Sequence, residues 1–193
     1  MKSLLIIFVA VFSPVLMANP MTGFGANYYN EESSVTYYDT HKDLVPKVVI
    51  GDRLFPFEIS RLTDIAKQTG AVVNRDDFAS WLCLTSENIT YWFISDNEMG
   101  QGDLTAIAIA REEKQKGCSA YKRYLNVSVK GIPLLGASTA TLFATFSSKP
   151  EGKITQYCND SRRYGDFTQS TCLQYYREKG ITKGVIISQI TAS

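Results

Sequence analysis

Residues 92–107 read WFISDNEMGQGDLTAI and place three carboxylates, Asp96, Glu98 and Asp103, between two apolar runs. Carboxylate oxygens at alternate positions are ligands for Ca²⁺, but a calcium loop of this kind also needs a third ligand before its glycine. The stretch DNEMGQGD lacks that ligand. Two apolar runs joined by polar residues and glycine are typical of a hairpin. We therefore interpret residues 96–103 as a solvated hairpin tip.

Contact with a protein partner is the best functional interpretation of this tip, because binding residues are concentrated on loops. A metal site is a weaker one, and we expect no metal there. The candidate partner-binding residues are Asp96, Asn97, Glu98, Met99, Gln101 and Asp103.

Several catalytic and cofactor-binding motifs are missing from the sequence. His41 is the only histidine, so a zinc site built on several histidines is excluded, and any Ser-His or Cys-His pair would have to use it. Neither a G-x-S-x-G motif nor a phosphate-binding glycine motif occurs. We expect no catalytic residue of these classes and no cofactor. A pair of carboxylates, as in glycosidases, remains an alternative. Its candidates are Glu58, Asp96, Glu98, Asp103 and Asp166.

The first residues have the pattern of a secretory signal, which we assign to residues 1–18. Lys2 supplies the charge, residues 4–12 form an apolar core too short to span a membrane, and Ala18 is the small residue before a cleavable bond. We expect the exported protein to begin at Asn19, to be periplasmic or secreted, and to have no later membrane span.

The four cysteines are Cys83, Cys118, Cys158 and Cys172. An even number in an exported chain, without the close pairs of a metal site, predicts two disulfides. Three connectivities are open, and we favour the pairing of neighbours in the sequence, Cys83–Cys118 and Cys158–Cys172.

The charges are balanced, with 20 Lys and Arg against 19 Asp and Glu. Such a balance gives no electrostatic reason to expect binding to nucleic acid or to acidic lipid. Three N-x-[ST] triplets begin at Asn88, Asn126 and Asn159, and they are candidate glycan sites only in a eukaryotic host.

The pattern of elements predicts one α+β domain over residues 46–193, with a mainly antiparallel sheet and two or three packed helices. A Tyr- and Asn-rich arm, residues 19–45, precedes this domain, and the sequence shows no long repeat. Apolar periodicity and stop residues predict helices over 58–69 and 166–179. A hairpin is predicted from 139–148 and 154–158, with a helix from Ser138 as the alternative. Further strands are expected at 79–86, 89–96, 104–111, 125–131 and 184–190.

These features favour an exported protein-binding module. The most concrete form of this hypothesis is an inhibitor or immunity protein that neutralises an enzyme attacking the envelope or the cell wall. An exported hydrolase with a carboxylate pair is the first alternative. The second is a surface-assembly subunit in which the N-terminal arm serves as an exchanged strand.

Overall fold

The computed structural model describes residues 20–29, 35–111 and 115–193 of the 193-residue chain. The expected signal segment and its cleavage point lie outside these residues. None of the helices in the described part is long and apolar enough to cross a membrane.

Strands dominate the described part of the chain, and three helices accompany them. The helices are the 3-10 helix η1 (Gly23–Tyr29), α1 (Leu62–Thr69) and α2 (Thr139–Phe146). The strands are β1 (Val35–Asp39), β2 (Pro46–Ile50), β3 (Arg53–Leu54), β4 (Asn74–Arg75), β5 (Ala79–Ser86), β6 (Ile89–Asp96), β7 (Ala106–Ala110), β8 (Ser119–Ala120), β9 (Leu125–Val129), β10 (Ile154–Tyr164), β11 (Phe167–Glu178) and β12 (Ile181–Ala192).

Within the described residues these strands form two sheets. The larger has nine strands in the order β1-β10-β11-β12-β7-β6-β5-β4, with β8 paired to β5, and the smaller has the order β3-β2-β9. Most neighbours are antiparallel, but β1 pairs with β10 and β8 pairs with β5 in parallel. The expected mainly antiparallel α+β domain is therefore correct only in outline, because the fold is sheet-dominated and the large sheet is mixed.

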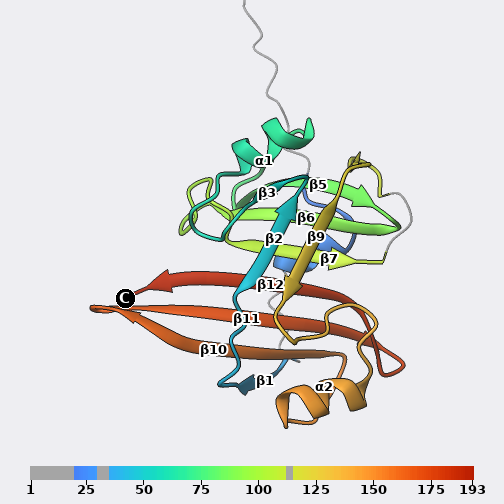
Figure 1. Ribbon diagram of the computed structural model, residues 1–193, viewed down its shortest axis with the longest axis vertical. Helices are drawn as coiled ribbons and strands as arrows, with labels where there is room; N and C mark the ends of the chain where they lie inside the picture. The colour runs from blue at the N-terminus through green and yellow to red at the C-terminus, as the bar shows by residue number, and fades with distance from the viewer. Residues whose placement is uncertain (1–19, 30–34, 112–114) are drawn as a thin grey trace, which may run out of the picture.

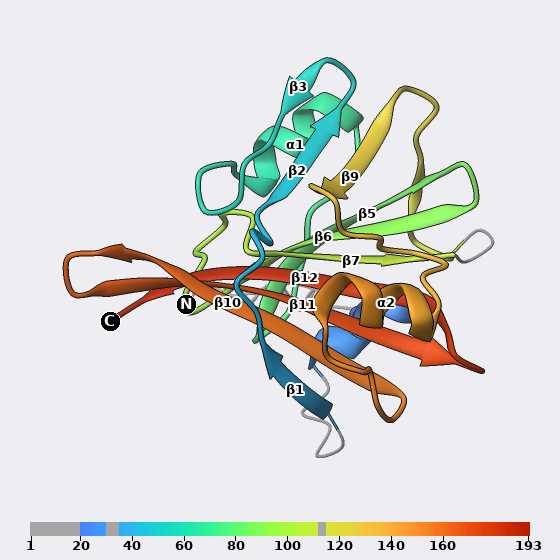
Figure 2. The ribbon, with the colours of Figure 1, turned by 60° about the horizontal axis from the view of Figure 1, so that its bottom comes forward.

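The two faces of the large sheet are covered differently. The small sheet, α1 and α2 lie on one face, and η1 lies on the other (Figures 1 and 2). Strand β7, with the sequence AIAIA, shows how one strand serves both sides. Ile107 and Ile109 enter the main core under the small sheet, whereas Ala106, Ala108 and Ala110 face η1. Small side chains on that face let η1 approach closely.

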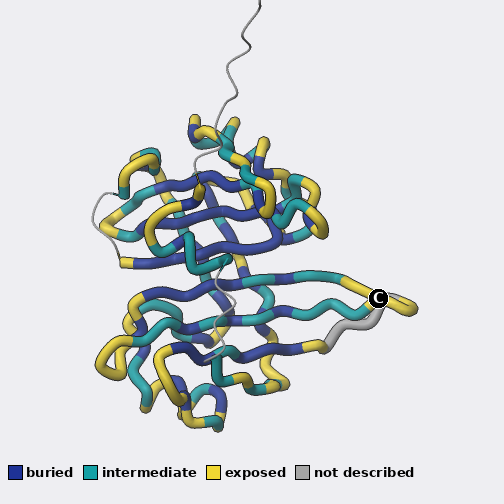
Figure 3. The backbone as a smooth tube through the Cα atoms, turned by 180° about the vertical axis from the view of Figure 1, so that it is seen from behind, coloured by how far each residue is buried: buried dark blue, intermediate teal, exposed yellow. Residues whose placement is uncertain are grey.

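Glycine is also required where η1 meets the sheet. A Cβ atom at Gly25 of η1 would overlap the ring of Trp92, and one at Gly184 of β12 would overlap the ring of Phe24. Seen from this side, the central parts of β6 and β7 are buried, those of β11 alternate between buried and intermediate, and many of the connections are exposed (Figure 3). The first part of the predicted arm is thus packed against the domain.

The structure contains a duplication that the sequence does not show. Apart from the two-residue strands β3, β4 and β8, the element series β2-α1-β5-β6-β7 is repeated as β9-α2-β10-β11-β12. Equivalent strands pair antiparallel, β7 with β12 and β2 with β9, as an approximate two-fold axis requires. Accordingly, α1 and α2 lie at opposite ends of the molecule (Figure 1).

Hydrogen bonds at the start of each helix support this equivalence. The N–H of Leu62 donates to the carbonyl of Gly102, and the N–H of Thr139 donates to that of Gly180. Both helices end at a residue in the left-handed conformation, Gly70 with φ 76° and Ser147 with φ 60°. The two halves share backbone geometry, while their side chains differ.

Two sequence-based assignments are wrong, and one alternative is confirmed. The predicted helix 166–179 is replaced by strand β11 (Phe167–Glu178), because pairing with β10 and β12 on both sides outweighs the helical spacing of Cys172, Tyr175 and Tyr176. Residues 139–148 do not form a strand, since they hold α2, whose first turn is capped by the Ser138 hydroxyl accepting from the Thr141 N–H at 3.1 Å.

Other assignments agree with the structure. Strands 79–86 and 89–96 have the predicted bounds, and the predicted helix 58–69 is present as the shorter α1. Both disulfides have the favoured pairing, Cys83–Cys118 and Cys158–Cys172. The second bridge joins residues that lie directly opposite each other on β10 and β11.

Glu58 occupies a backbone position where the other half has glycine. Its N–H donates to Leu104 O as that of Gly136 donates to Thr182 O, and φ is 58° at Glu58 and 77° at Gly136. A left-handed backbone costs a non-glycine residue about 1–2 kcal/mol. Glutamate therefore needs a compensating interaction at this position.

The carboxylate of Glu58 supplies that interaction by accepting hydrogen bonds from residues near the start of β11 and the end of β12. Its Oε1 accepts from the Thr191 N–H at 2.6 Å. Its Oε2 accepts from Gln169 Nε2 at 2.8 Å, Thr191 Oγ1 at 2.9 Å and Gln189 Nε2 at 3.1 Å. Hydrogen bonds to a charged group stabilise more than neutral ones, so this cluster fixes the segment before α1 onto the second half.

A matched pair of variants tests both contributions of Glu58. Glu58→Ala should lower the free energy of unfolding by about 2–4 kcal/mol, because several donors lose their acceptor. Glu58→Gly loses the same bonds but relieves the left-handed strain, so it should be more stable than Glu58→Ala by about 1 kcal/mol. Chemical denaturation of both variants measures the difference. Equal stability, or a more stable alanine variant, would contradict this account of the backbone.

Candidate binding site

The acidic tip predicted from the sequence lies where the two halves differ most in length. Residues 97–105 connect β6 to β7, whereas Lys179 and Gly180 alone connect β11 to β12. Both connections contain a left-handed pair, Gln101-Gly102 in the first half and Lys179-Gly180 in the second. Residues 97–100, which precede the first pair, have no counterpart between β11 and the second. The second half forms its turn without equivalents of residues 97–100, so the fold itself does not explain their presence.

Asp96 holds the backbone of this connection in place. Its Oδ1 accepts from the N–H groups of Glu98 at 2.8 Å and Met99 at 2.9 Å, and its carbonyl accepts from Gly100 N at 2.9 Å. Gly100 is buried, and a Cβ there would lie 2.7 Å from Ser95 Oγ. The connection is therefore an ordered turn with its backbone donors satisfied.

Asp76 plays the same part in the neighbouring connection between β4 and β5. Its Oδ1 accepts from the N–H groups of Phe78 at 2.9 Å and Ala79 at 2.8 Å. Asn97 joins the two connections, because its side-chain amide donates to Asp76 O at 2.8 Å and its N–H donates to Phe78 O at 2.9 Å. In each of these two connections one aspartate accepts hydrogen bonds from the backbone N–H groups, and we call the two connections the capped loops. Hydrogen bonds of Asn97 join them.

Two tyrosines of η1 complete the arrangement. Tyr28 donates its hydroxyl to Asp96 Oδ2 at 3.1 Å, and Tyr29 donates to Asp76 Oδ2 at 2.6 Å. Burial raises the pKa of both phenols above the usual range, and the charge and hydrogen bond of the neighbouring aspartate raise it further. The Tyr-rich arm and the acidic tip, which the sequence presents as separate features, therefore meet at one site.

A cavity of about 460 Å³ opens beside these tyrosine–aspartate pairs. Tyr28, Tyr29, Phe78 and Asp96 line it, together with residues of β11 and β12. We call this space the tyrosine–aspartate cavity. Two apolar side chains are exposed on the capped loops, Phe78 at 71% and Met99 at 52%.

The predicted partner-binding residues fall into two groups. Glu98, Met99 and Gln101 are exposed, whereas Asp96, Asn97 and Asp103 are partly buried. Asp96 and Asn97 serve mainly to order the loops, and Asp103 faces Arg61, with 3.6 Å between Asp103 Oδ1 and Arg61 Nε. Sequence reasoning missed Asp76 and Phe78, although an aspartate two residues before a turn N–H is itself a turn signal.

The remaining candidates do not converge on one catalytic centre. The carboxylate of Glu58 binds β11 and β12, and Asp166 is exposed at the tip between β10 and β11. His41 is exposed, and it lines a different cavity from Asp96. Within residues 20–29, 35–111 and 115–193, no group of three or more His, Cys, Asp or Glu side chains is arranged to hold a metal ion.

Comparisons of the chain with protein-family models, with curated proteins and with solved structures found no match. The function is therefore inferred from the geometry of this site.

The raised tyrosine pKa values predict how stability changes at alkaline pH. A phenol whose folded-state pKa lies above its ordinary value of 10.0 stays neutral after the unfolded chain has begun to ionise. Its contribution to stability is complete below pH 10 and is lost as the pH rises beyond it. Tyr28 and Tyr29 should therefore ionise only when the protein unfolds. Ultraviolet absorbance during alkaline titration measures this, and Tyr28→Phe and Tyr29→Phe should each reduce the late, unfolding-linked signal. A reduction in the early signal near pH 10 would show that the prediction is wrong.

Proposed function

We propose that the protein is an exported binding protein that presents the β6–β7 connection to a protein partner. In its most concrete form it is an inhibitor or immunity protein, and its partner is an enzyme that attacks the envelope or the cell wall. One observation carries the proposal. Exposed Glu98 and Met99 lie on an ordered connection that the equivalent half of the fold makes without residues 97–100.

The order of this connection favours tight binding. An apolar side chain on a flexible loop loses conformational freedom when it binds, and that loss weakens the complex. The N–H groups of Met99 and Phe78 are already bonded to the carboxylates of Asp96 and Asp76. The side chains of Met99 and Phe78 can therefore bind in a pocket of the partner with little further loss of backbone freedom, as the central contacts of protein interfaces do.

The disulfides and the signal pattern favour an extracytoplasmic location. Two bridges in a chain of this size are typical of proteins that fold in an oxidising compartment. An inhibitor of an envelope-attacking enzyme must act in that compartment.

The hydrolase alternative receives less support from the geometry of the cavity. Glycosidase chemistry needs two carboxylates facing the substrate. Among the described side chains that line the tyrosine–aspartate cavity, Asp96 is the only carboxylate, and it already accepts three hydrogen bonds.

One observation favours the surface-assembly alternative. Strand β1 belongs to the N-terminal arm and forms one edge of the large sheet, where it pairs with β10 of its own chain. The same strand could pair with β10 of another copy. Concentration-dependent formation of dimers or filaments by the purified protein would favour that function.

The proposal predicts which exposed apolar side chains contribute to partner binding. The mature protein, immobilised, should capture an envelope-directed enzyme and reduce its activity. Met99→Ala and Phe78→Ala should each weaken binding of that enzyme by more than about 1 kcal/mol, because they remove contacts at the centre of the interface. The melting temperature of Met99→Ala should be almost unchanged, since Met99 is half exposed.

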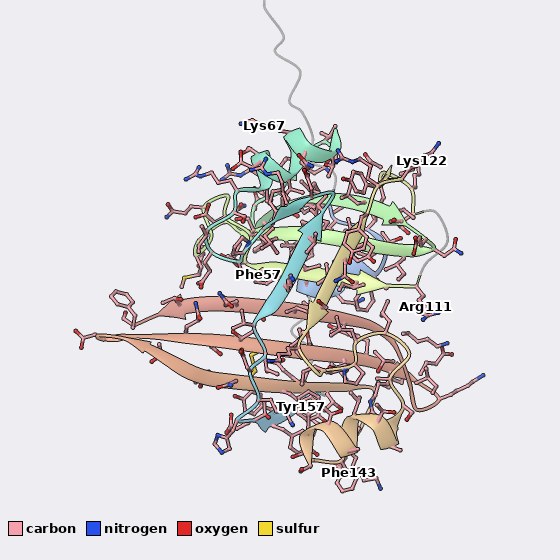
Figure 4. The ribbon with its side chains drawn as sticks, in the orientation of Figure 1. Phe57, Lys67, Arg111, Lys122, Phe143 and Tyr157 are labelled. Atoms are coloured by element: carbon pink, nitrogen blue, oxygen red, sulfur yellow. A yellow bond between two sulfur atoms is a disulfide. The ribbon has the colours of Figure 1, made fainter. Side chains whose placement is uncertain are left out.

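Phe143→Ala is the matched control. Phe143 is 51% exposed, and it lies on α2, at the opposite end of the molecule from α1 (Figure 4). The same Phe→Ala change there should leave binding unaffected. If Met99→Ala and Phe78→Ala bind the enzyme as the wild type does, or if the captured enzyme keeps full activity, the proposed function is wrong.

A further inference from the structure

The geometry points to a specific ligand for the tyrosine–aspartate cavity: we propose that it receives an arginine side chain of the partner. The inference rests on the proposed function, because it names the partner group that this site recognises.

Charge is the first argument. The carboxylate of Asp96 lines the cavity, and that of Asp76 lies behind the Tyr29 hydroxyl. Neither aspartate forms a salt bridge with any residue that the structure describes, and no cationic side chain is among the described lining. A carboxylate that no cation neutralises favours a positively charged ligand.

The shape and composition of the lining give the second argument. Ile186 and Ile190 of β12 supply apolar surface, and the rings of Tyr28, Tyr29 and Phe78 supply aromatic surface. An arginine has an apolar stem that packs on such surface and a planar cation that stacks on aromatic rings. A volume of about 460 Å³ is in the range of ordinary ligand sites.

Uncommitted hydrogen-bonding groups give the third argument. Asp96 Oδ2 accepts one bond, from Tyr28, and a carboxylate oxygen can accept two. Gln174 and Ser188 also line the cavity, and their side chains make no hydrogen bond to any described residue. A guanidinium carries five N–H donors in a rigid plane, so it can use several of these acceptors at once. The ammonium of lysine is more strongly hydrated and has no plane to stack on a ring.

Small-molecule probes test this inference without a partner protein. N-acetylarginine amide should bind the mature protein saturably, and it should shift the NMR signals of Gln174 and Ser188. N-acetylcitrulline amide has nearly the same shape but no charge, and it should bind about tenfold more weakly or not at all, because a hydrogen bond to a charged group is lost. Equal binding of the two probes, or no saturable binding of the arginine probe, would overturn the inference.

Variants locate the bound probe. Asp96→Asn keeps an oxygen for the turn N–H groups but removes the charge, and it should weaken arginine-probe binding about tenfold. Asp77→Asn removes the same charge from an exposed residue that does not line the cavity, and it should leave binding unchanged. Gln174 lines the cavity from β11, so Gln174→Ala should also weaken binding. This second variant keeps the test valid if Asp96→Asn fails to fold. Unchanged probe binding in folded Asp96→Asn or in Gln174→Ala would overturn the inference.

The experiments distinguish failure of the arginine-binding inference from failure of the proposed function. If the arginine probe does not bind but partner binding still depends on Met99 and Phe78, the inference is wrong and the proposed function stands. If the probe binds with the predicted dependence on Asp96 but no inhibited enzyme is found, the cavity is a cation site and the proposed function is wrong.

Discussion

The pairing of β7 with β12 is the contact on which the rest of the fold depends. It runs from Ala110 opposite Gly184 to Ala106 opposite Ser188, and it joins the strands β1-β10-β11-β12 to the strands β7-β6-β5-β4, with β8, in one large sheet. Without it, β7 and β12 would each be an unpaired strand edge. Isoleucine and alanine alternate along β7, so that both faces of the joined sheet present apolar side chains for packing. One carries the small sheet with α1 and α2, and the other receives η1.

Because the two halves have equivalent backbones, the places where they differ are informative. The left-handed position before the helix is Gly136 in the second half and Glu58 in the first. Glutamate at such a position is unfavourable by itself, yet its carboxylate binds Gln169, Gln189 and Thr191. The other main difference is the connection 97–105, which carries Glu98 and Met99 and borders the tyrosine–aspartate cavity. One difference thus has a structural explanation, and the other is the basis of the proposed function.

Local patterns in the sequence were sufficient to predict some elements and not others. Strands β5 and β6 could be predicted because they are short runs rich in apolar, β-branched and aromatic residues, and because Glu87 and Asn88, which both adopt positive φ, join them in a tight turn. Strand β11 could not be, because its helical spacing is overridden by pairing on both sides. The duplication also stayed hidden, since equivalent positions share backbone geometry while carrying different side chains, as Glu58 and Gly136 do.

The candidate site was predicted in parts. The acidic tip and the Tyr-rich arm are each evident in the sequence, but their contact through Tyr28 and Asp96 spans 68 residues. Only the tertiary fold brings η1 across the sheet to the loop ends, and no local spacing encodes that distance. The same holds for Asp76 and Phe78, since the hydrogen bonds of Asn97 that link their loop to the acidic tip form only in the folded chain.

The central claim is that the two capped loops present Phe78 and Met99 on an ordered backbone. Amide hydrogen exchange followed by NMR tests it most directly, because an N–H bonded to a carboxylate exchanges more slowly than a free one. The N–H groups of Glu98, Met99, Phe78 and Ala79 should exchange clearly more slowly than that of Asp77. Asp77 lies in the same connection as Phe78, and its N–H has no partner among the described residues. Exchange of the capped amides at the rate of an unstructured peptide would contradict the account, because the exposed side chains would then lie on flexible loops.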